Sequence, residues 1–443
     1  MSRAVIRFQD ADDGSGVWFC LQSPGGAMLS KLACRPNDKE FAFDGDPMIT
    51  VAGVTLRDSL LAHKGISGRL DSWLKMEDKE FLSLQLQLES TIADQLPWEA
   101  LVDYHDSFLA LDSQSPLTRV LPADRQDRVR REFPFVPPLR IACVLGAWWD
   151  SGGLQQQADE WSSVRDGLAA AASADMPVVV RIYSCAAALE AQVMATPPPN
   201  VTLQWSTITG NAPALLGDIN QFSPHILHLY AHGSAGDQQY LSVSTASDVA
   251  QGNAHGSILI TPRDIRQVAD RDEYVWSIAL NCCDSAAMTI DGRHFAWQLV
   301  KFGFPAVIAM REAVKTTETR TVSRFFYEAA LKALRDIPVG GRKDVEWASF
   351  LQRVRIELAG GNALAAQNKR WLIPVLYART EPFQIFRCKP GLDEKERIRL
   401  RAQREELINQ RDATLQTSMP ADVKDQVRQV FDQKIAEIDA QLV

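Results

Sequence analysis

The chain has 443 residues, enough for roughly three domains at about 150 residues each. Hydrophobic residues make up 46% and charged residues 23%, which is typical of a soluble globular protein and excludes a disordered or fibrous chain. The net charge of −8 argues against a protein that binds nucleic acid phosphates or anionic lipids. No apolar run reaches the about 18–20 residues that span a bilayer, and the N-terminus lacks the apolar core of a signal peptide.

Seven cysteines are spread along the chain, apart from the adjacent pair Cys282 and Cys283. Their number is odd and no CxxC spacing occurs, so neither a disulfide framework nor a zinc site is indicated. We therefore predict a cytoplasmic protein with reduced thiols, without a metal or an organic cofactor. One of these thiols is a candidate for chemistry.

Residues 1–78 are predicted to form a small strand-rich region. Two short β-type runs, Ala4–Phe8 and Val17–Leu21, flank a turn-forming Asp-Asp-Gly-Ser-Gly segment. The clearest strand follows at Phe81–Leu88, where leucines alternate with serine and glutamine. This period of two predicts one apolar and one polar face.

From residue 139 the pattern becomes that of an α/β protein, because continuous apolar runs alternate with helical patterns. The predicted strands are Leu139–Leu145, Val178–Tyr183, Ile226–Tyr230, Val275–Leu280, Ala306–Met310 and Leu372–Tyr377. The predicted helices are Ala158–Ala172, Ala186–Met194, Arg263–Val268, Arg293–Phe302, Thr317–Leu334 and Ala348–Leu358. We therefore predict a mostly parallel sheet flanked by helices, in a domain that covers residues 79–390.

Residues 391–443 are predicted to form a C-terminal helical hairpin. Apolar residues recur at helical spacing in its second half, and Ser418-Met419-Pro420 interrupts the pattern. The apolar stripe consists of Val427, Phe431, Ile435, Ile438 and Leu442. We expect it to pack on the body of the protein, or to hold a regulator or a second copy of the chain. With 9 basic and 11 acidic residues in 392–443, nucleic acid is a poor candidate for a partner.

Two of the predicted strands lead into side chains that can do chemistry. Ile226–Tyr230 is followed by His232-Gly233, and Val275–Leu280 is followed by Asn281 and the cysteine pair. Open α/β sheets build their sites at the carboxyl ends of strands. A cysteine with a histidine about 50 residues upstream is typical of caspase-type proteases, and Cys283 lies 51 residues after His232.

The pair has a chemical rationale. A cysteine thiol with a pKa near 8.5 is mostly protonated at neutral pH, and His232 could take its proton and later protonate a leaving amine. The backbone N–H groups of Gly233 and Cys283 could form an oxyanion hole. Adjacent residues of a strand face opposite sides, so only one of Cys282 and Cys283 can face His232. We favour Cys283, which is nearer the open end of the strand.

Two nearby histidines offer another hypothesis. His225 and His228 are three residues apart and should lie on opposite strand faces, and no His-Glu-x-x-His pattern occurs, so a zinc site with His232 is not favoured. His228, four residues before His232, should share its face and is interpreted as a packed core histidine.

These segments resemble the CHAT family of caspase-like, separase-related cysteine peptidases. Ile226–Gly233 is similar to its strand that ends in His-Gly, and Leu280–Ala286 is similar to its Leu-Asn/Ser-Ala-Cys-x-Ser/Thr-Ala motif, with Cys282 in place of alanine. Other similar segments are Leu96–Leu101, Phe108–Leu111, Gly303–Met310, Phe325–Tyr327 and Trp371–Tyr377. The resemblance covers about residues 80–385 and implies a caspase–haemoglobinase-like fold with a His232–Cys283 dyad.

The resemblance also implies a function: a cysteine endopeptidase that cleaves a protein substrate through an acyl-enzyme. Similar bacterial proteases often act as regulated effectors of antiviral defence or cell death and cut a co-encoded protein. The alternative is a catalytically inactive scaffold of the same fold that binds partner proteins.

Two acidic residues are candidates for the substrate pocket. Asp284 directly follows the nucleophile and Glu312 follows the next core strand, so both could favour a basic P1 residue by Coulomb attraction. Alternatively, Asp284 only caps the next helix.

Overall fold

The structure is a computed structural model of the chain. It describes residues 2–12, 16–21, 29–36, 41, 48–124, 132–148, 152–234, 239–253, 256–268, 275–282, 285, 294–361, 368–388, 394–415 and 419–442. The chain divides into two compact units. Unit 1 comprises residues 1–129, 139–332 and 346–381, and unit 2 comprises residues 130–138, 333–345 and 382–443.

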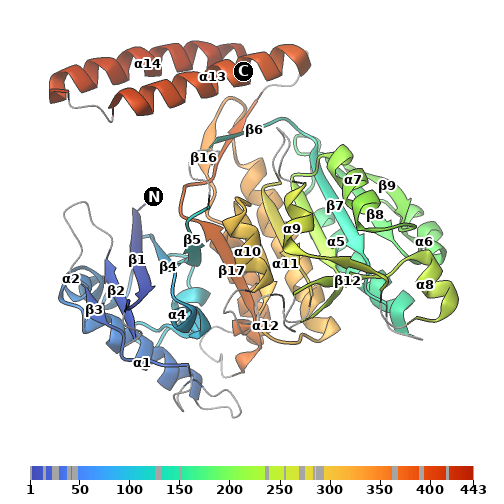
Figure 1. The fold of residues 1–443 in the computed structure, drawn as a ribbon, viewed down its shortest axis with the longest axis horizontal. Coiled ribbons are helices and arrows are strands. Elements are labelled where there is room, and N and C mark those ends of the chain that lie inside the picture. Colours follow the sequence, from blue (N-terminus) through green and yellow to red (C-terminus); the bar gives the residue numbers. More distant parts are fainter. Residues whose placement is uncertain are drawn as a thin grey trace. The chain divides into compact units, whose positions relative to one another are not determined.

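One large sheet forms the centre of unit 1 (Figure 1). Its strands are β1 (Ser2–Asp10), β2 (Val17–Leu21), β3 (Ser30–Lys31), β4 (Leu82–Leu88), β5 (Leu117–Leu121), β7 (Leu139–Leu145), β8 (Val178–Ser184), β9 (Val201–Thr207), β10 (Ile226–Tyr230), β14 (Ser277–Leu280), β15 (Ala306–Met310) and β17 (Pro374–Arg379). They lie in the order β3-β2-β1-β4-β5-β17-β15-β14-β10-β7-β8-β9. Within the described strands, neighbours run parallel except for β1–β2, β2–β3 and β15–β17. The predicted mostly parallel α/β sheet is confirmed.

The antiparallel pair β15–β17 divides this sheet into two halves of opposite direction. β1, β4, β5 and β17 point one way, and β15, β14, β10, β7, β8 and β9 point the other way. The carboxyl ends of β7, β10 and β14, which are neighbours, therefore meet at one edge of the sheet.

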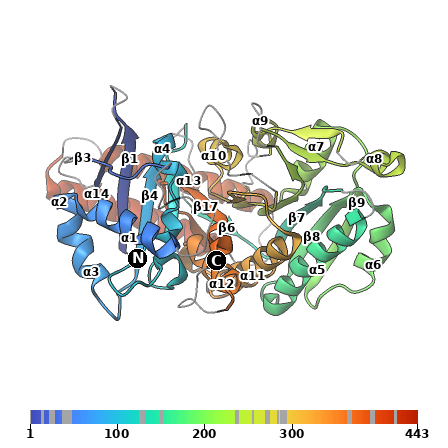
Figure 2. The same ribbon diagram turned by 90° about the horizontal axis from the view of Figure 1, so that it is seen from below.

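Helices cover both faces of the sheet. They are α5 (Gly153–Ala171), α6 (Glu190–Met194), α7 (Ala212–Phe222), α8 (Ala246–Gln251), α9 (Pro262–Arg266), α10 (Phe295–Lys301), α11 (Thr316–Arg335) and α12 (Ala348–Leu358). Figure 2 shows α5 and α11 on one side, and α7, α9 and α10 on the other. Ile219, Ile265 and Leu299 of the latter three helices share a buried core with Leu227 and Leu280 of the sheet. No helix in the described part of the chain is long and apolar enough to cross a membrane.

The N-terminal region continues the same sheet, so the expected boundary at residue 78/79 does not separate two compact units. β1 pairs with β4 in parallel, with Ile6 opposite Leu86. The region also contains α1 (Met48–Leu61), α2 (Lys64–Ile66), a π-helical turn at Ser67–Asp71 and α3 (Ser72–Leu74), so helices accompany its strands. A few isolated strands cannot bury their apolar face, and the shared core of Phe8, Leu56 and Leu86 supplies that burial.

The predicted polar face of β4 is also covered. Gln85 and Gln87 are only 6% and 7% exposed. Ser83 donates a 2.6 Å hydrogen bond to the buried carboxylate of Glu346, 263 residues later in the chain. Strand β4 thus has one apolar and one polar face, as predicted. Both faces are buried, because a distant carboxylate accepts a hydrogen bond from the polar face.

Unit 2 contains a three-stranded sheet and the C-terminal hairpin. Its strands are β6 (Glu132–Phe135), β16 (Arg342–Asp344) and β18 (Gln384–Arg387), in the order β16-β18-β6. The hairpin helices α13 (Glu394–Leu415) and α14 (Ala421–Leu442) pack on each other (Figure 1). The predicted helical hairpin is thus confirmed.

One end of the hairpin packs on the sheet of unit 2. Leu400 of α13 and Ile438 of α14 are buried against Phe386 and Cys388. The Arg404 guanidinium donates a 2.6 Å hydrogen bond to Asp439 within this contact. Toward the other end of α14, Val430 is 54% exposed. Val430 lies outside the apolar stripe, of which Ile435 and Ile438 are buried and Val427 and Phe431 are half-buried.

Candidate active site

His232 lies beyond the end of β10, on a separate short strand. β10 ends at Tyr230, and β11 (His232–Gly233) pairs antiparallel with β12 (Leu241–Val243), which pairs with β13 (Ile258–Ile260). His232 is opposite Ser242 and is half-buried. It is therefore not on the strand of His228, and the expectation that the two histidines share a strand face does not apply.

The imidazole of His232 is oriented by a backbone carbonyl. Its Nε2 lies 2.9 Å from the carbonyl oxygen of Trp148. A carbonyl oxygen can only accept, so Nε2 must be the donor. In the neutral ring the proton is then on Nε2, and Nδ1 is the basic nitrogen.

The segment that provides this carbonyl is fixed by backbone contacts. The N–H groups of Gly146 and Ala147, which follow β7, both donate to the carbonyl of Tyr230, at 2.8 and 2.9 Å. A Cβ on Gly146 would lie 2.6 Å from Cγ1 of Val243, and a Cβ on Gly153 would lie 2.7 Å from the Trp148 ring. Both glycines are thus required for the close packing that sets the position of Trp148.

The cysteine pair follows β14, the parallel neighbour of β10. The Asn281 N–H donates to the carbonyl of Leu229 at 2.9 Å. The Cys282 thiol is only 1% exposed and also donates to that carbonyl, at 3.2 Å. Cys282 is therefore directed into the core and onto β10. Cys283 and Asp284 lie outside the described residues.

Ser285, two residues after Cys283, is anchored to two other elements. It is buried, and its hydroxyl accepts a 3.0 Å hydrogen bond from the Met310 N–H at the end of β15. Its carbonyl accepts from the N–H of Ala296 in α10. Ser285, the hydroxyl residue of the Cys-x-Ser-Ala motif, is thus bound to both β15 and α10.

The remaining predicted site residues lie on different elements. Gly233 is on β11, opposite Leu241. Glu312 follows β15; its side chain is 47% exposed, and its Oε2 lies 3.2 Å from Nζ of Lys369. The negative charge of Glu312 is therefore partly compensated by a neighbouring cation.

The other two histidines of the motif have partners of their own. Nδ1 of His225 accepts a 3.0 Å hydrogen bond from the Arg140 N–H, and its ring packs on Trp276. Nε2 of His228 lies 3.1 Å from Oε1 of Glu160, and both side chains are buried. Within the described ranges, no group of three His, Cys, Asp or Glu side chains could hold a metal ion.

The segment Leu96–Leu101 is held by a buried ionic cluster. The guanidinium of Arg119 donates to both carboxylate oxygens of Glu99, at 2.9 and 2.7 Å, and to Asp94 at 3.0 Å. Asp94 also accepts from Tyr377 and lies 3.0 Å from Nε2 of His294, the residue before α10. Burial alone would raise the pKa of Asp94, but His294, Arg119 and Tyr377 hold it at about 2.

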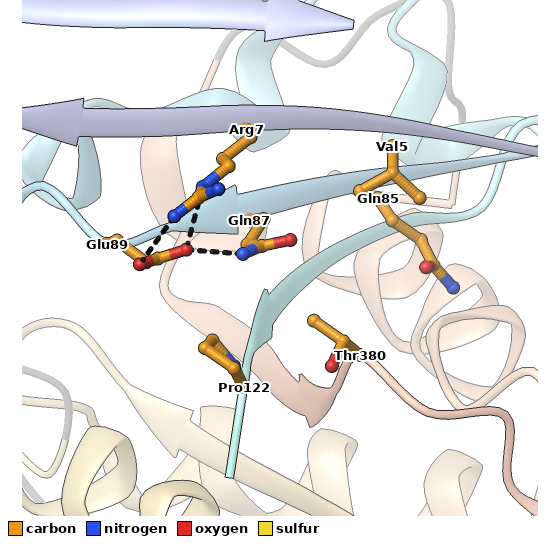
Figure 3. A pocket seen from close by; sticks show the side chains of 7 residues that line it. All are labelled: Val5, Arg7, Gln85, Gln87, Glu89, Pro122 and Thr380. Carbon is orange, nitrogen blue, oxygen red and sulfur yellow. Dashed lines mark hydrogen bonds and ion pairs between the residues drawn. The ribbon is translucent and has the colours of Figure 1, made fainter. Parts of the chain in front are cut away.

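A polar pocket of about 440 Å³ lies elsewhere in unit 1 (Figure 3). It is lined by Val5, Arg7, Gln85, Gln87, Glu89, Pro122 and Thr380, so it contains none of the predicted site residues. It is near the carboxyl ends of β1, β4 and β5, at the edge of the sheet opposite to that of β10 and β14. Arg7 and Glu89 form an ion pair of 3.1 Å there, so opposite charges face each other.

Sequence reasoning missed two residues of this site. Trp148 contributes its backbone carbonyl, so its residue type gives no indication in the sequence that it contacts the histidine. Glu160 is on α5, 121 residues before its hydrogen-bond partner Asn281, and no local pattern relates the two.

A mostly parallel sheet with a histidine and a cysteine pair after neighbouring strands is the arrangement of caspase-like cysteine peptidases. The CHAT domain matches residues 61–337, and the chain belongs to this family. Similar solved structures include two of the Saccharomyces cerevisiae separase–securin complex, with 13% and 12% identity and TM-scores of 0.35 and 0.36. Each match covers 75% of this chain and 17% of the separase chain.

Another similar structure is that of the Arg-specific cysteine proteinase gingipain R, with 9% identity and a TM-score of 0.39. That match covers 72% of this chain and 68% of gingipain R. No curated protein matches the chain.

Proposed function

We propose that the chain is a cysteine endopeptidase in which Cys283 is the nucleophile and His232 the general acid and base. The observation that carries the proposal is the hydrogen bond from His232 Nε2 to the Trp148 carbonyl, which leaves Nδ1 as the basic nitrogen. β10 and β14 are parallel neighbours, so the segments that follow them start from the same edge of the sheet.

The chemistry follows from these roles. Nδ1 of His232 takes the thiol proton, and the thiolate attacks the scissile carbonyl to form a C–S bond. The backbone N–H groups of Gly233 and Cys283 bind the developing oxyanion. The C–N bond then breaks as the imidazolium gives its proton to the amine. Water, deprotonated by His232, hydrolyses the thioester and restores the thiol.

The surroundings of Cys282 favour Cys283 as the nucleophile. The Cys282 thiol is buried and donates to the Leu229 carbonyl, so it is directed away from solvent. A buried thiol is a poor nucleophile because burial disfavours the thiolate.

In cellular terms, we propose a regulated effector protease of the cytoplasm, in bacterial defence or cell death, that cuts a co-encoded protein. The hairpin α13–α14 is proposed to bind a regulator or a second copy of the chain, since Val430 remains exposed on α14. An inactive scaffold is the alternative that the test below must exclude.

The test compares three proteins: the wild type, Cys283→Ala and the matched control Cys282→Ala. Each is incubated at neutral pH with iodoacetamide and, separately, with a peptide library, and mass spectrometry reads out labelling and cleavage. We expect the wild type and Cys282→Ala to cleave peptides and to be labelled at Cys283, and Cys283→Ala to do neither. Activity in Cys283→Ala with loss in Cys282→Ala would reverse the assignment, and no labelling or cleavage in any protein would support the scaffold.

A further inference from the structure

A buried polar cluster joins the two strands that precede the proposed dyad. The carboxylate of Glu160, on α5, accepts a 2.8 Å hydrogen bond from Asn281 and another from the hydroxyl of Ser323 on α11. Nε2 of His228, on β10, lies 3.1 Å from the same oxygen, Oε1. Glu160, Ser323 and His228 lie on three different elements, Asn281 directly follows β14, and all four side chains are almost fully buried. We name them the Glu160 cluster.

The carboxylate is anionic in the folded protein. Burial alone would raise the pKa of Glu160, but His228, Ser323 and Asn281 hold it below its usual range. The other titratable groups that face it are Cys143 on β7 and Tyr327 on α11. Burial and the charge of Glu160 raise the pKa of each well above its usual value, so both are neutral.

The cluster is poorly suited to stabilising the fold. Among the described residues, Oε2 of Glu160, Nδ1 of His228 and Oδ1 of Asn281 are buried without a hydrogen-bond partner. Buried polar atoms without a partner cost free energy, and buried ion pairs are often no more stabilising than apolar side chains of similar volume. The composition of the Glu160 cluster therefore indicates a role other than stabilising the fold.

Its position indicates that role. Asn281 directly follows β14 and is two residues before Cys283, while His228 is on β10, four residues before His232. The backbone N–H of Asn281 is already bound to β10 through Leu229. The side chain of Asn281 adds a second attachment, to Glu160, so the segment that leads into Cys283 is fixed both across the sheet and to α5.

We propose that the Glu160 cluster positions the nucleophile: through Asn281 it fixes the end of β14 relative to β10, and so sets how closely Cys283 is coupled to His232. Its members are positioning residues and do not touch the substrate. This inference rests on the proposed function, because it assigns the cluster to the same dyad.

The test uses the pH dependence of alkylation at Cys283, which reports the coupling of thiol and imidazole without a substrate. Iodoacetamide labelling rates are measured from pH 5 to 9 by mass spectrometry of the Cys283 peptide, in the wild type, Glu160→Gln, Asn281→Leu and Ser323→Ala. A coupled thiol reacts with an inflection below the free-thiol value of about 8.5. We expect the variants to move the inflection toward that value and to lower kcat about tenfold with little change in KM.

Ser323→Ala is the variant least at risk of misfolding, because alanine is favourable in a helix and the hydroxyl alone is removed. The matched control is Glu346→Gln, which alters another buried carboxylate of unit 1 that accepts hydrogen bonds from two hydroxyls, Ser83 and Thr118. We expect the control to lower the melting temperature without moving the inflection.

The outcomes separate the two proposals. If His232→Ala shifts the inflection of Cys283 but the cluster variants behave as Glu346→Gln does, the positioning role is wrong and the dyad stands. If the wild type shows no inflection below that of a free thiol and His232→Ala leaves the pH dependence of Cys283 labelling unchanged, the dyad and the positioning role are both wrong.

Discussion

The imidazole Nε2 of His232 lies 2.9 Å from the carbonyl oxygen of Trp148, a residue 84 positions earlier in the chain. One hydrogen bond to a backbone acceptor thus sets both the ring orientation and the tautomer of the proposed base. The geometry of this contact depends on the backbone after β7, and two closely packed glycines set the position of that backbone.

Gly146→Ala should disturb this carbonyl. The new Cβ would lie 2.6 Å from Cγ1 of Val243, so the backbone before Trp148 must shift. We expect kcat to fall on the order of 10- to 100-fold, because small displacements of a catalytic group are costly. Steady-state kinetics and thermal denaturation measure the effect. Gly217→Ala on α7, where a Cβ meets nothing within 4 Å, is the control and should remain fully active.

His232→Ala should remove the acid and the base while the protein stays folded, since the side chain is only half-buried. We expect kcat/KM to fall at least about 100-fold, the low end for general acid–base catalysis. Peptide hydrolysis and far-UV circular dichroism check the two parts of the prediction. Near-normal turnover would refute the dyad.

Acid stability should depend on Asp94. Its pKa is about 2 in the folded protein, below its ordinary value of 3.8, so the folded state favours the anion. This contribution to stability is present above about pH 4 and is lost as the pH falls toward 2. Asp94→Asn should therefore lower the free energy of unfolding by about 3 kcal/mol at pH 7, because it breaks a buried ionic cluster.

The difference between wild type and Asp94→Asn should shrink as the pH falls from 4 to 2. Denaturant titrations at a series of pH values measure it. Asp124→Asn removes a more exposed carboxylate, which pairs with Lys301 at 3.2 Å, and should show no such difference. A difference for Asp94→Asn that is constant down to pH 2 would contradict the assigned cause.

Substrate preference tests the proposed role of Glu312. If this carboxylate attracts a basic P1 residue, Glu312→Gln should weaken that preference about two- to fivefold, the range of a partly exposed charge. Lys369→Ala should strengthen it, because the ammonium 3.2 Å away competes for the same charge. A peptide-library profile decides the matter. An apolar P1 preference, or equal profiles for both variants, would reject a role for Glu312.

The hairpin should detach when its buried end is charged. Ile438→Asp places a carboxylate among Phe386, Cys388 and Leu400, and should cost about 3 kcal/mol of local stability. We expect faster proteolysis within residues 391–443, measured by limited digestion. Val430→Asp, at an exposed position, should digest like the wild type.

Light scattering on the same variants, and on a protein truncated after Pro390, tests self-association. A change in mass for Val430→Asp would identify the exposed part of α14 as the contact. A truncated protein with unchanged solubility, mass and activity would show that the hairpin has neither a packing nor a partner role.

The strands next to the site were predictable because they are buried on both faces. Leu139–Leu145, Ile226–Tyr230 and Ala306–Met310 are apolar apart from Arg140 and His228, and the structure has the same bounds for β7, β10 and β15. β9 (Val201–Thr207) was missed, because it lies at the edge of the sheet and carries mixed, half-buried residues. The hairpin was predictable because its apolar residues recur at helical spacing.

The sequence by itself determined the strands that precede the proposed dyad. Each strand can be recognised from its own residues, and the histidine or cysteine that follows it is only a few positions away. Only the tertiary structure decided how the imidazole of His232 is oriented and which side chain binds Asn281. Trp148 reaches His232 through a backbone atom, and Glu160 reaches Asn281 from another helix. Such contacts join residues 84 and 121 positions apart, and their geometry is set by how strands and helices pack rather than by any local pattern.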